Sequence, residues 1–383
     1  MSGSLTNLND YVEVVMGQAP PGDKCNKNGE GTVFVKAGEF QERTPIAREW
    51  TTKPLKMAQP DDSLVCVVGA TAGKVNISSF NCAIGRSVAA VRPKHNKIDP
   101  IFLYQFLQTQ VEQLRDRSQG AAQGVITREM LLGLNLAVPP LPEQRRIAAL
   151  LDQAETLRTQ RRTALALLDS LTQSLFLDMF GDPAKNPYGW VIGKIGDMLE
   201  SASYGTSEKS GPDGEFPVLR MNNITRTGEL DLEDLKYMDL LGKDHERYLV
   251  KAGDVLFNRT NSAELVGKTA IVPQSAPSLA YAGYLVRLRV NDANHPMYLA
   301  RFLNTSYAKR MLRGMCKSIV GMANINAKEI QAMRIALPPL PLQQTFATRI
   351  QSIEALKATH RRALAALDEL FASLQQRAFA GLL

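Results

Sequence analysis

A long internal repeat constrains this chain more than any other feature of its sequence. Residues 139–181 return without a gap as residues 338–380, and 18 of the 43 paired positions are identical. Each copy opens with Pro-Pro-Leu-Pro and continues without an internal Gly or Pro through helix-forming residues, which predicts one long helix per copy. The chain is therefore expected to hold two versions of one unit, each a variable segment followed by a long helix.

The first helix is expected to end near Phe180, with Gly181 as a left-handed cap and Pro183 preventing continuation. A helix of about 36 residues, at about 1.5 Å per residue, would be roughly 54 Å long, which is comparable with one and a half turns of B-DNA. Two equivalent helices that pair about a local two-fold axis perpendicular to them run antiparallel, whereas parallel pairing would crowd both large segments at one end. We therefore expect a coiled-coil-like spacer with the two variable segments at its opposite ends.

Apolar residues recur in both predicted helices at alternating spacings of three and four, which indicates a seam for a single partner helix. Arg161 and His360 interrupt this seam at equivalent positions. The residues predicted to pack the spacer are Ile147, Leu150, Leu157, Leu168, Leu171 and Leu175 in the first copy, and Phe346, Ile353, Leu356, Leu367, Leu370 and Leu374 in the second.

The repeat divides the chain into four predicted segments: 1–138 (head 1), 139–181 (central spacer helix), 182–337 (head 2) and 338–383 (C-terminal spacer helix). Both heads show short apolar runs and turns typical of strands, followed by one helix. The predicted fold class is α+β, with two mixed α/β domains separated by two long antiparallel helices and an internal pseudo-two-fold repeat.

The charge of the chain favours a polyanionic partner. A net charge of +7 and an isoelectric point near 9.2 make nucleic acid plausible, because Lys and Arg neutralise phosphates and release counterions. The four cysteines lie far apart, which argues against a disulfide framework and a structural zinc site. We expect a cytoplasmic protein without a membrane segment, because signal-peptide and membrane-spanning patterns are missing.

The loops of the heads carry side chains suited to DNA. Arg can form two parallel bonds to guanine, Asn can do so to adenine, and Lys supplies phosphate contacts. Because loops on a rigid frame usually carry recognition residues, two heads with different loops are expected to read different sequences. The candidates are Lys36, Arg43, Arg48, Lys74 and Arg86 in head 1, and Arg220, Asn222, Asn223, Arg226, Arg259, Asn261 and Lys268 in head 2.

The order of variable segment and Pro-rich long helix, given twice, resembles the specificity (S) subunit of a type I restriction-modification enzyme. The resemblance covers essentially the whole chain. Its most specific motifs are the helix entry at 136–144 with its counterpart at 335–343, the Phe-Gly-Asp-Pro exit at 180–183, and Asn-Pro-Tyr-Gly-Trp at 186–190. Leu342-Gln343-Gln344 departs from the Glu-Gln-Arg of the first copy.

The resemblance implies that the heads are target recognition domains, and that each reads half of a bipartite, interrupted DNA site. It implies a non-catalytic DNA-binding subunit that directs adenine methylation and cleavage by partner subunits. The expected partners are double-stranded DNA, two methyltransferase (M) subunits and restriction (R) subunits. S-adenosylmethionine, ATP and Mg are expected on those partners, and no cofactor is expected in this chain.

Two alternatives remain open from the sequence. Asp213, Asp234 and Lys236 fit a loose metal-dependent nuclease pattern, in which two acids hold a cation and Lys assists the attacking water. The other alternative is a coiled-coil adaptor that does not bind DNA. The four histidines are scattered without metal-ligand spacing, so we predict neither catalytic residues nor a metal site.

Overall fold

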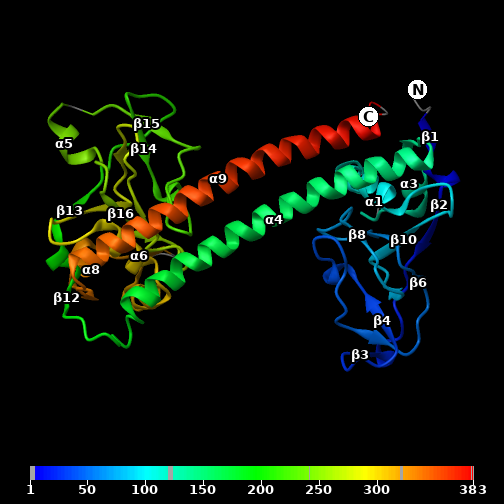
Figure 1. Cartoon of the computed structure of the whole chain (residues 1–383), viewed down its shortest axis with the longest axis horizontal. Coiled ribbons are helices and arrows are strands. Elements are labelled where there is room, and N and C mark those ends of the chain that lie inside the picture. The colour runs from blue at the N-terminus through cyan, green and yellow to red at the C-terminus, as the bar shows by residue number, and fades with distance from the viewer. Residues whose placement is uncertain (1–4, 120–123, 241, 320–321, 381, 383) are drawn as a thin grey trace. The chain divides into compact units, whose positions relative to one another are not determined.

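The computed structural model describes residues 5–119, 124–240, 242–319, 322–380 and 382 (Figure 1). The chain divides into two compact units. Unit 1 comprises Met1–Arg162 and Arg362–Leu383, and unit 2 comprises Thr163–Arg361. Each unit therefore contains one head together with a part of both long helices.

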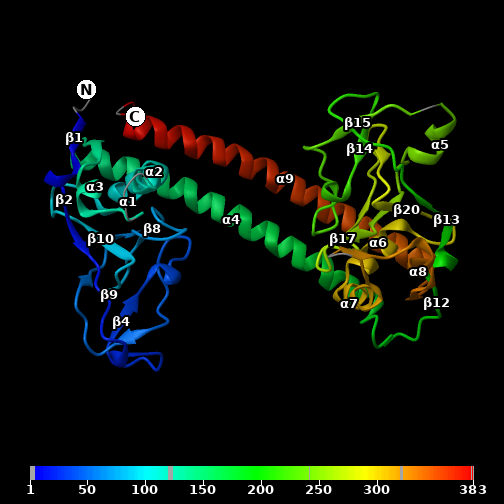
Figure 2. The same cartoon turned by 180° about the vertical axis from the view of Figure 1, so that it is seen from behind.

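The two predicted long helices are confirmed. They are α4 (Leu141–Phe180) and α9 (Leu340–Phe379), each of 40 residues, and Figures 1 and 2 show both as continuous ribbons. Gly181 follows α4 with a φ of 82°, the left-handed conformation expected of a helix-ending glycine. A Cβ at Gly181 would lie 2.4 Å from the Pro187 side chain, so the chain exit requires glycine for space as well as for conformation.

Each head contains a four-stranded antiparallel sheet of the same topology. In head 1 the order is β2-β10-β7-β8, and in head 2 it is β13-β20-β16-β18. The head 1 strands are β2 (Val12–Met16), β10 (Val88–Pro93), β7 (Ser63–Cys66) and β8 (Val75–Ile77). The head 2 strands are β13 (Leu199–Tyr204), β20 (Leu285–Val290), β16 (Val255–Asn258) and β18 (Thr269–Ile271). The duplication therefore extends beyond the helices to the frame of both heads.

A second sheet in each head contains one parallel pair of strands. In head 1, β4 pairs with β9 within the order β3-β5-β4-β9-β6, and in head 2, β14 pairs with β19 within the order β15-β14-β19. Head 2 also has a three-stranded sheet, β17-β22-β21. The bounds in head 1 are β3 (Cys25–Asn26), β4 (Thr32–Val35), β5 (Trp50–Thr51), β6 (Met57–Ala58) and β9 (Cys82–Ile84). Those in head 2 are β14 (Phe216–Leu219), β15 (Lys236–Met238), β17 (Thr260–Asn261), β19 (Ala280–Tyr281), β21 (Lys317–Ile319) and β22 (Met322–Asn324).

Short helices and a two-stranded pair complete each head. The pairs are β1 (Leu5–Asn7) with β11 (Asn135–Ala137), and β12 (Ile192–Lys194) with β23 (Arg334–Ala336). The helices of head 1 are α1 (Pro100–Thr109), α2 (Val111–Gln119) and α3 (Arg128–Leu132). Those of head 2 are α5 (His245–Tyr248), α6 (Pro296–Asn304), α7 (Ser306–Met315) and α8 (Ala327–Ala332) (Figure 2).

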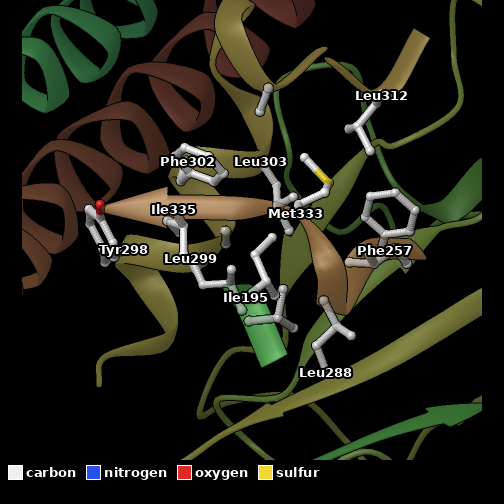
Figure 3. Close-up of a cluster of buried hydrophobic side chains, with 14 of the residues drawn as sticks. Ile195, Phe257, Leu288, Tyr298, Leu299, Phe302, Leu303, Leu312, Met333 and Ile335 are labelled. Carbon is white, nitrogen blue, oxygen red and sulfur yellow. The ribbon is translucent and has the colours of Figure 1, made fainter. Parts of the chain in front are cut away.

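In each unit the core joins the head to the long helices. In unit 1, the ring of Phe379 on α9 lies 5.3 Å from that of Phe102 on α1. In unit 2, the ring of Phe180 on α4 lies 4.7 Å from Tyr298 on α6 and 5.0 Å from Phe346 on α9. Figure 3 shows Tyr298 in the same buried cluster as Phe302 of α6 and Ile335 of β23. The aromatic contacts therefore attach each head firmly to its part of the spacer.

A buried glutamine near the start of each long helix makes the same attachment. Gln144 accepts a hydrogen bond from the backbone N–H of Asp99 at 2.7 Å and donates to Pro139 O at 2.8 Å. Its repeat equivalent Gln343 accepts from the N–H of His295 at 2.8 Å and donates to Pro338 O at 2.8 Å. Asp99 and His295 are the N-cap residues of α1 and α6, so both glutamines link a long helix to the head helix beside it.

Within each unit the two long helices run antiparallel, as predicted. In unit 2, Asp169 of α4 pairs with Lys357 of α9, whereas Phe176, further along α4, contacts the earlier residue Phe346 of α9. In unit 1, the Arg158 guanidinium lies 4.3 Å from the ring centre of Phe371 of α9, whereas Arg162, further along α4, pairs with the earlier residue Asp368 at 3.4 Å. Rising numbers in one helix therefore meet falling numbers in the other.

The predicted seam is wrong at every second position, where the residue that faces the other helix is the one after the predicted leucine. Ile147, Leu168, Leu175, Phe346, Ile353 and Leu374 do lie in or against the buried clusters, and Leu367 is half-buried. Leu150, Leu157, Leu171, Leu356 and Leu370 are instead 37–50% exposed. The next residue takes the inner position, as at Leu151, Arg158 and Lys357. Apolar periodicity predicted leucine at these inner positions. At Arg158 and Lys357 the structure instead buries charged side chains that are paired with carboxylates.

Candidate nucleic-acid interface

The same short turn follows the parallel strand in both heads. It comprises Ala37–Glu39 after β4 and Met221–Asn223 after β14, and we call it the cap turn. Lys36 and Arg220 occupy equivalent N-cap positions, and their backbone N–H groups donate at 2.8 Å to the side chains of Glu39 and Asn223. Each turn is thus closed by its own side chain and holds its exposed residues in one conformation.

In each head, a lysine side chain donates hydrogen bonds to backbone carbonyls in or next to the cap turn. Lys74 Nζ donates to Phe40 O at 3.2 Å, and Lys268 Nζ donates to Met221 O at 2.9 Å and to Ile224 O. Burial, followed by the charge of Arg226, lowers the pKa of Lys268. Both predicted DNA contacts therefore have their ammonium groups bound to backbone carbonyls at the base of the turn.

Other predicted contacts are also bound within the fold. The Lys36 ammonium pairs with Glu49, and Arg220 pairs with Asp234 at 2.9 Å. Asn223 is 2% exposed, and its amide donates to the carbonyls of Asp231 and Asp234 at 2.9 Å. The Arg43 guanidinium pairs with Asp152 of α4. These side chains stabilise the loops on which more exposed residues lie.

Four of the predicted contacts are exposed. They are Arg48 and Arg86 in head 1, and Asn222 and Arg226 in head 2. Asn222 lies within the cap turn and Arg226 just beyond it, on a loop whose backbone is held by the N–H of Asp231 donating to Asn223 O at 2.9 Å. Exposed Arg and Asn side chains on a rigid loop are the groups that base-edge and phosphate contacts require.

The remaining pair of predicted contacts, Arg259 and Asn261, lies at the junction of β16 and β17. Arg259 Nη2 donates to Asn324 Oδ1 at 3.0 Å, and its guanidinium carbon lies 4.9 Å from the ring centre of Tyr204. Tyr204 is 41% exposed and Tyr284 is 48% exposed. The exposure of these two tyrosines could not be predicted from the sequence, because an exposed tyrosine at a strand end has the same local pattern as a buried one.

One of the two acidic residues of the nuclease alternative has another role in the structure. The Asp234 carboxylate accepts from Arg220 Nη2 at 2.9 Å, and Asp213 is exposed. Among the residues that the structure describes, no group of three or more His, Cys, Asp or Glu side chains is placed to hold a metal ion. Nor is any helix in the described ranges long and apolar enough to cross a membrane.

A family model agrees with the duplicated architecture. The model described as the type I restriction modification DNA specificity domain matches residues 5–166 and again residues 187–369. The two matches each cover one head and most of the helix that follows it, in the same order as the repeat.

Two relatives show how far the sequence similarity extends. The EcoKI specificity subunit of a type I restriction enzyme, from Escherichia coli strain K12, is 26% identical over 358 residues, which cover 86% of this chain and 76% of the relative. A protein of Methanocaldococcus jannaschii that is named as the MjaX specificity subunit of a type I restriction enzyme is 35% identical over 139 residues. These residues cover 36% of this chain and 32% of the relative. The second match therefore spans about a third of that relative.

Two solved structures share the fold. The S subunit of a type I restriction-modification system from M. genitalium aligns with a TM-score of 0.62 at 15% identity, over 98% of this chain and 96% of that one. A chain from a structure concerned with complex assembly and conformational transition of the type I R-M system gives a TM-score of 0.58 at 17% identity, over 100% and 99%. At these identities the likeness shows the fold.

Proposed function

Because the chain belongs to the type I restriction-modification DNA specificity family, as a non-catalytic specificity subunit, we propose that it reads a bipartite, interrupted DNA site. Each head would read one half of that site. Partner methyltransferase and restriction subunits would then methylate adenine and cleave DNA at the place that this chain selects. S-adenosylmethionine, ATP and Mg would be bound by those partners.

One observation carries the proposal: the two heads share a frame but differ at the exposed positions of the same turn. In head 1 the cap turn is Ala37–Glu39 with Lys36 before it, and in head 2 it is Met221–Asn223 with Arg220 before it. A shared frame with different exposed side chains is what two readers of different half-sites require.

The charge of the chain supplies the sequence-independent part of binding. The net charge of +7 favours DNA over neutral partners, and exposed cations such as Arg48, Arg86 and Arg226 can contact phosphates. Affinity should therefore fall as salt concentration rises, because phosphate contacts release counterions.

The exposed leucines of the long helices support the partner proposal. Leu157 and Leu356 are repeat equivalents that are 37% and 47% exposed, and Leu171 and Leu370 are a second such pair at 48% and 50%. Unit 1 holds one residue of each pair and unit 2 the other. Two equivalent sets of exposed apolar side chains would suit two copies of one methyltransferase subunit.

The test is a selection of DNA sequences from a random library by the full chain bound to its methyltransferase partner. We expect enrichment of two short motifs separated by a gap of fixed length, with affinity that falls as salt increases. Replacing Arg226 by Gln should weaken binding or relax one motif, with Lys209→Gln on the same head as a control for loss of one exposed charge. Enrichment of one continuous motif, or of none, would contradict the proposal.

A further inference from the structure

In both heads a short loop follows the cap turn and is closed by a single β-bridge. The bridge joins Phe40 to Pro45 in head 1 and Ile224 to Leu230 in head 2. We call residues 40–45 and 224–230 the tie loops, because each carries a charged side chain that reaches a long helix of its own unit.

The tie of head 1 is a single ion pair. The Arg43 guanidinium pairs with Asp152 of α4, and both side chains are 38% exposed. The same guanidinium lies 5.8 Å from the ring centre of Tyr104 on α1. The cation is on the loop and the anion on the helix.

The tie of head 2 is a network with a nearly buried centre. Glu229 accepts from Lys357 Nζ at 2.7 Å through one oxygen and from Arg361 Nη2 at 2.6 Å through the other. Lys357 also pairs with Asp169 of α4 at 2.7 Å and with Glu354 at 3.2 Å, and its side chain is 2% exposed. Here the anion is on the loop and the cations are on the helix, so the polarity is the reverse of that in head 1.

The charges agree with a strong tie in head 2. Burial alone would raise the pKa of the Glu229 carboxyl, but its bonds to Arg361 and Lys357 outweigh that effect and lower the pKa to about 2. Burial would lower the pKa of Lys357, but bonds to Asp169 and Glu229 raise it. Both partners are therefore held in their charged forms at neutral pH.

The anion in the tie of head 1 lies at a position where the two helix copies differ. Residues 152 and 351 are repeat equivalents, and they are Asp152 in α4 but Gln351 in α9. Lys357 is equivalent to Arg158, which bonds with Glu155 and Asp368 of the helices themselves. Arg361 is likewise equivalent to Arg162, so both helix copies carry the two cations, and Asp152 is the residue that distinguishes α4 from α9 in these ties.

Hydrogen bonds within the tie loop of head 2 connect Glu229 to the segment that carries the exposed Arg226. The N–H of Glu229 donates to Thr225 Oγ1 at 3.0 Å, and Thr225 N–H donates to Glu229 O at 2.9 Å. Gly228 has a φ of 84°, and a Cβ there would lie 2.4 Å from Asn304 Nδ2 of α6. A tight loop that is clamped at Glu229 therefore fixes the position of Arg226 within it.

We propose that Glu229 with Lys357 and Arg361, and Arg43 with Asp152, are positioning residues that hold each recognition loop at one place on its spacer helix. These ties would restrict how many unread base pairs separate the two half-sites, because a loop that cannot slide or tilt on its helix accepts DNA at one distance. The proposal rests on the proposed function of the chain as a reader of a bipartite site.

The experiment uses the full chain in complex with its methyltransferase partner and duplexes carrying the selected half-sites. The gap is the selected length or is changed by one base pair in either direction. For Glu229→Gln we expect the preference for the correct gap to fall about tenfold, while the preference for correct over altered half-site bases is kept. Glu233→Gln, which removes an exposed carboxylate from the same head, should leave both preferences unchanged.

The ion pair of head 1 provides a second test that does not disturb a buried charge. Arg43→Asp should weaken the preference for the correct gap, and adding Asp152→Arg should restore it, because the pair is rebuilt with its charges exchanged. If Glu229→Gln fails to fold, the head 1 pair decides the outcome. Unchanged gap preference in Arg43→Asp or in folded Glu229→Gln would overturn the proposal, whereas a wild-type complex without half-site preference would instead refute the proposed function.

Discussion

Head 1 and head 2 agree in their buried frame and differ in their loops. In head 1, Asp62 is 2% exposed at its side chain and pairs with Arg92 at 2.8 Å, and in head 2 Asp254 is likewise 2% exposed and pairs with Arg289 at 2.8 Å. Both pairs lie at equivalent strand positions of the four-stranded sheets. Both frames therefore contain the same ion pair with a buried Asp, whereas the ion pairs that join each tie loop to its long helix have opposite polarity. The two heads thus differ in how their loops are held, on a frame that they share.

The units also differ in how the last aromatic residue of each long helix is packed. Phe180 and Phe379 are repeat equivalents, but Phe180 is buried at 3% exposure while Phe379 is half-buried. We predict that Phe180→Ala lowers the free energy of unfolding of the full chain by about 4 kcal/mol and Phe379→Ala by about 2 kcal/mol. Urea denaturation measures both values. Equal losses, or a larger loss at Phe379, would show that burial does not distinguish the units.

The two units also differ in how deeply they bury the charged residues between the long helices. Lys357→Met leaves Asp169, Glu229 and Glu354 without their shared cation, and we expect a loss of about 3 kcal/mol in the free energy of unfolding. Arg158→Met, the repeat equivalent, should cost about 1.5 kcal/mol, because the Arg158 side chain is 17% exposed and its carboxylate partners remain partly solvated. The two variants are compared by urea denaturation, and a larger loss at Arg158 would refute the difference between the units.

The pH dependence of stability tests the tie of head 2. The pKa of Glu229 is lowered from 4.5 to about 2 in the folded chain, so its stabilisation is complete above pH 4.5 and is lost as the pH falls towards 2. Glu229→Gln should therefore cost about 2 kcal/mol at pH 7, with the difference from wild type shrinking below pH 4.5. Thermal unfolding across this range measures it, with Glu233→Gln as the matched variant. A constant difference down to pH 2 would show that the charge of Glu229 does not contribute.

The exposed leucines should have the smallest effect on stability. Leu157→Ser and Leu356→Ser are each expected to change the free energy of unfolding by about 0.5 kcal/mol or less, because neither side chain is buried. They should nevertheless weaken binding of the methyltransferase subunit, as measured by titration calorimetry. Gln160→Ser, at another exposed position of α4, provides the control. If both leucine variants bind the methyltransferase subunit with unchanged affinity, these residues do not contribute to the partner surface.

The sequence predicted the large architecture because its signals are local. The Pro-Pro-Leu-Pro entries, the helix-forming runs and Gly181 act through backbone propensities within a few residues. The seam was wrong at every second position for a different reason. Arg158 and Lys357 lie at inner positions only because carboxylates distant in sequence, such as Asp368 and Asp169, neutralise them, and periodicity alone carries no information about such partners.

The candidate interface was less accessible from the sequence. Residue type identified Arg226 and Asn222, which are exposed, but equally selected Lys268 and Asn223, which bind backbone carbonyls. Whether a polar side chain supports a loop or faces solvent depends on tertiary contacts. The tie at Glu229 could not be predicted from local sequence, because its partners Lys357 and Arg361 lie 128 and 132 positions further along the chain.

The most direct test of the account is the exchange of head 2, residues 182–337, for the second head of another family member, followed by mapping of the adenines methylated by the reconstituted complex. We predict that one half of the recognised site changes to the donor sequence while the other half stays the same. A change in both halves, or in neither, would contradict the claim that each head reads its own half of the site.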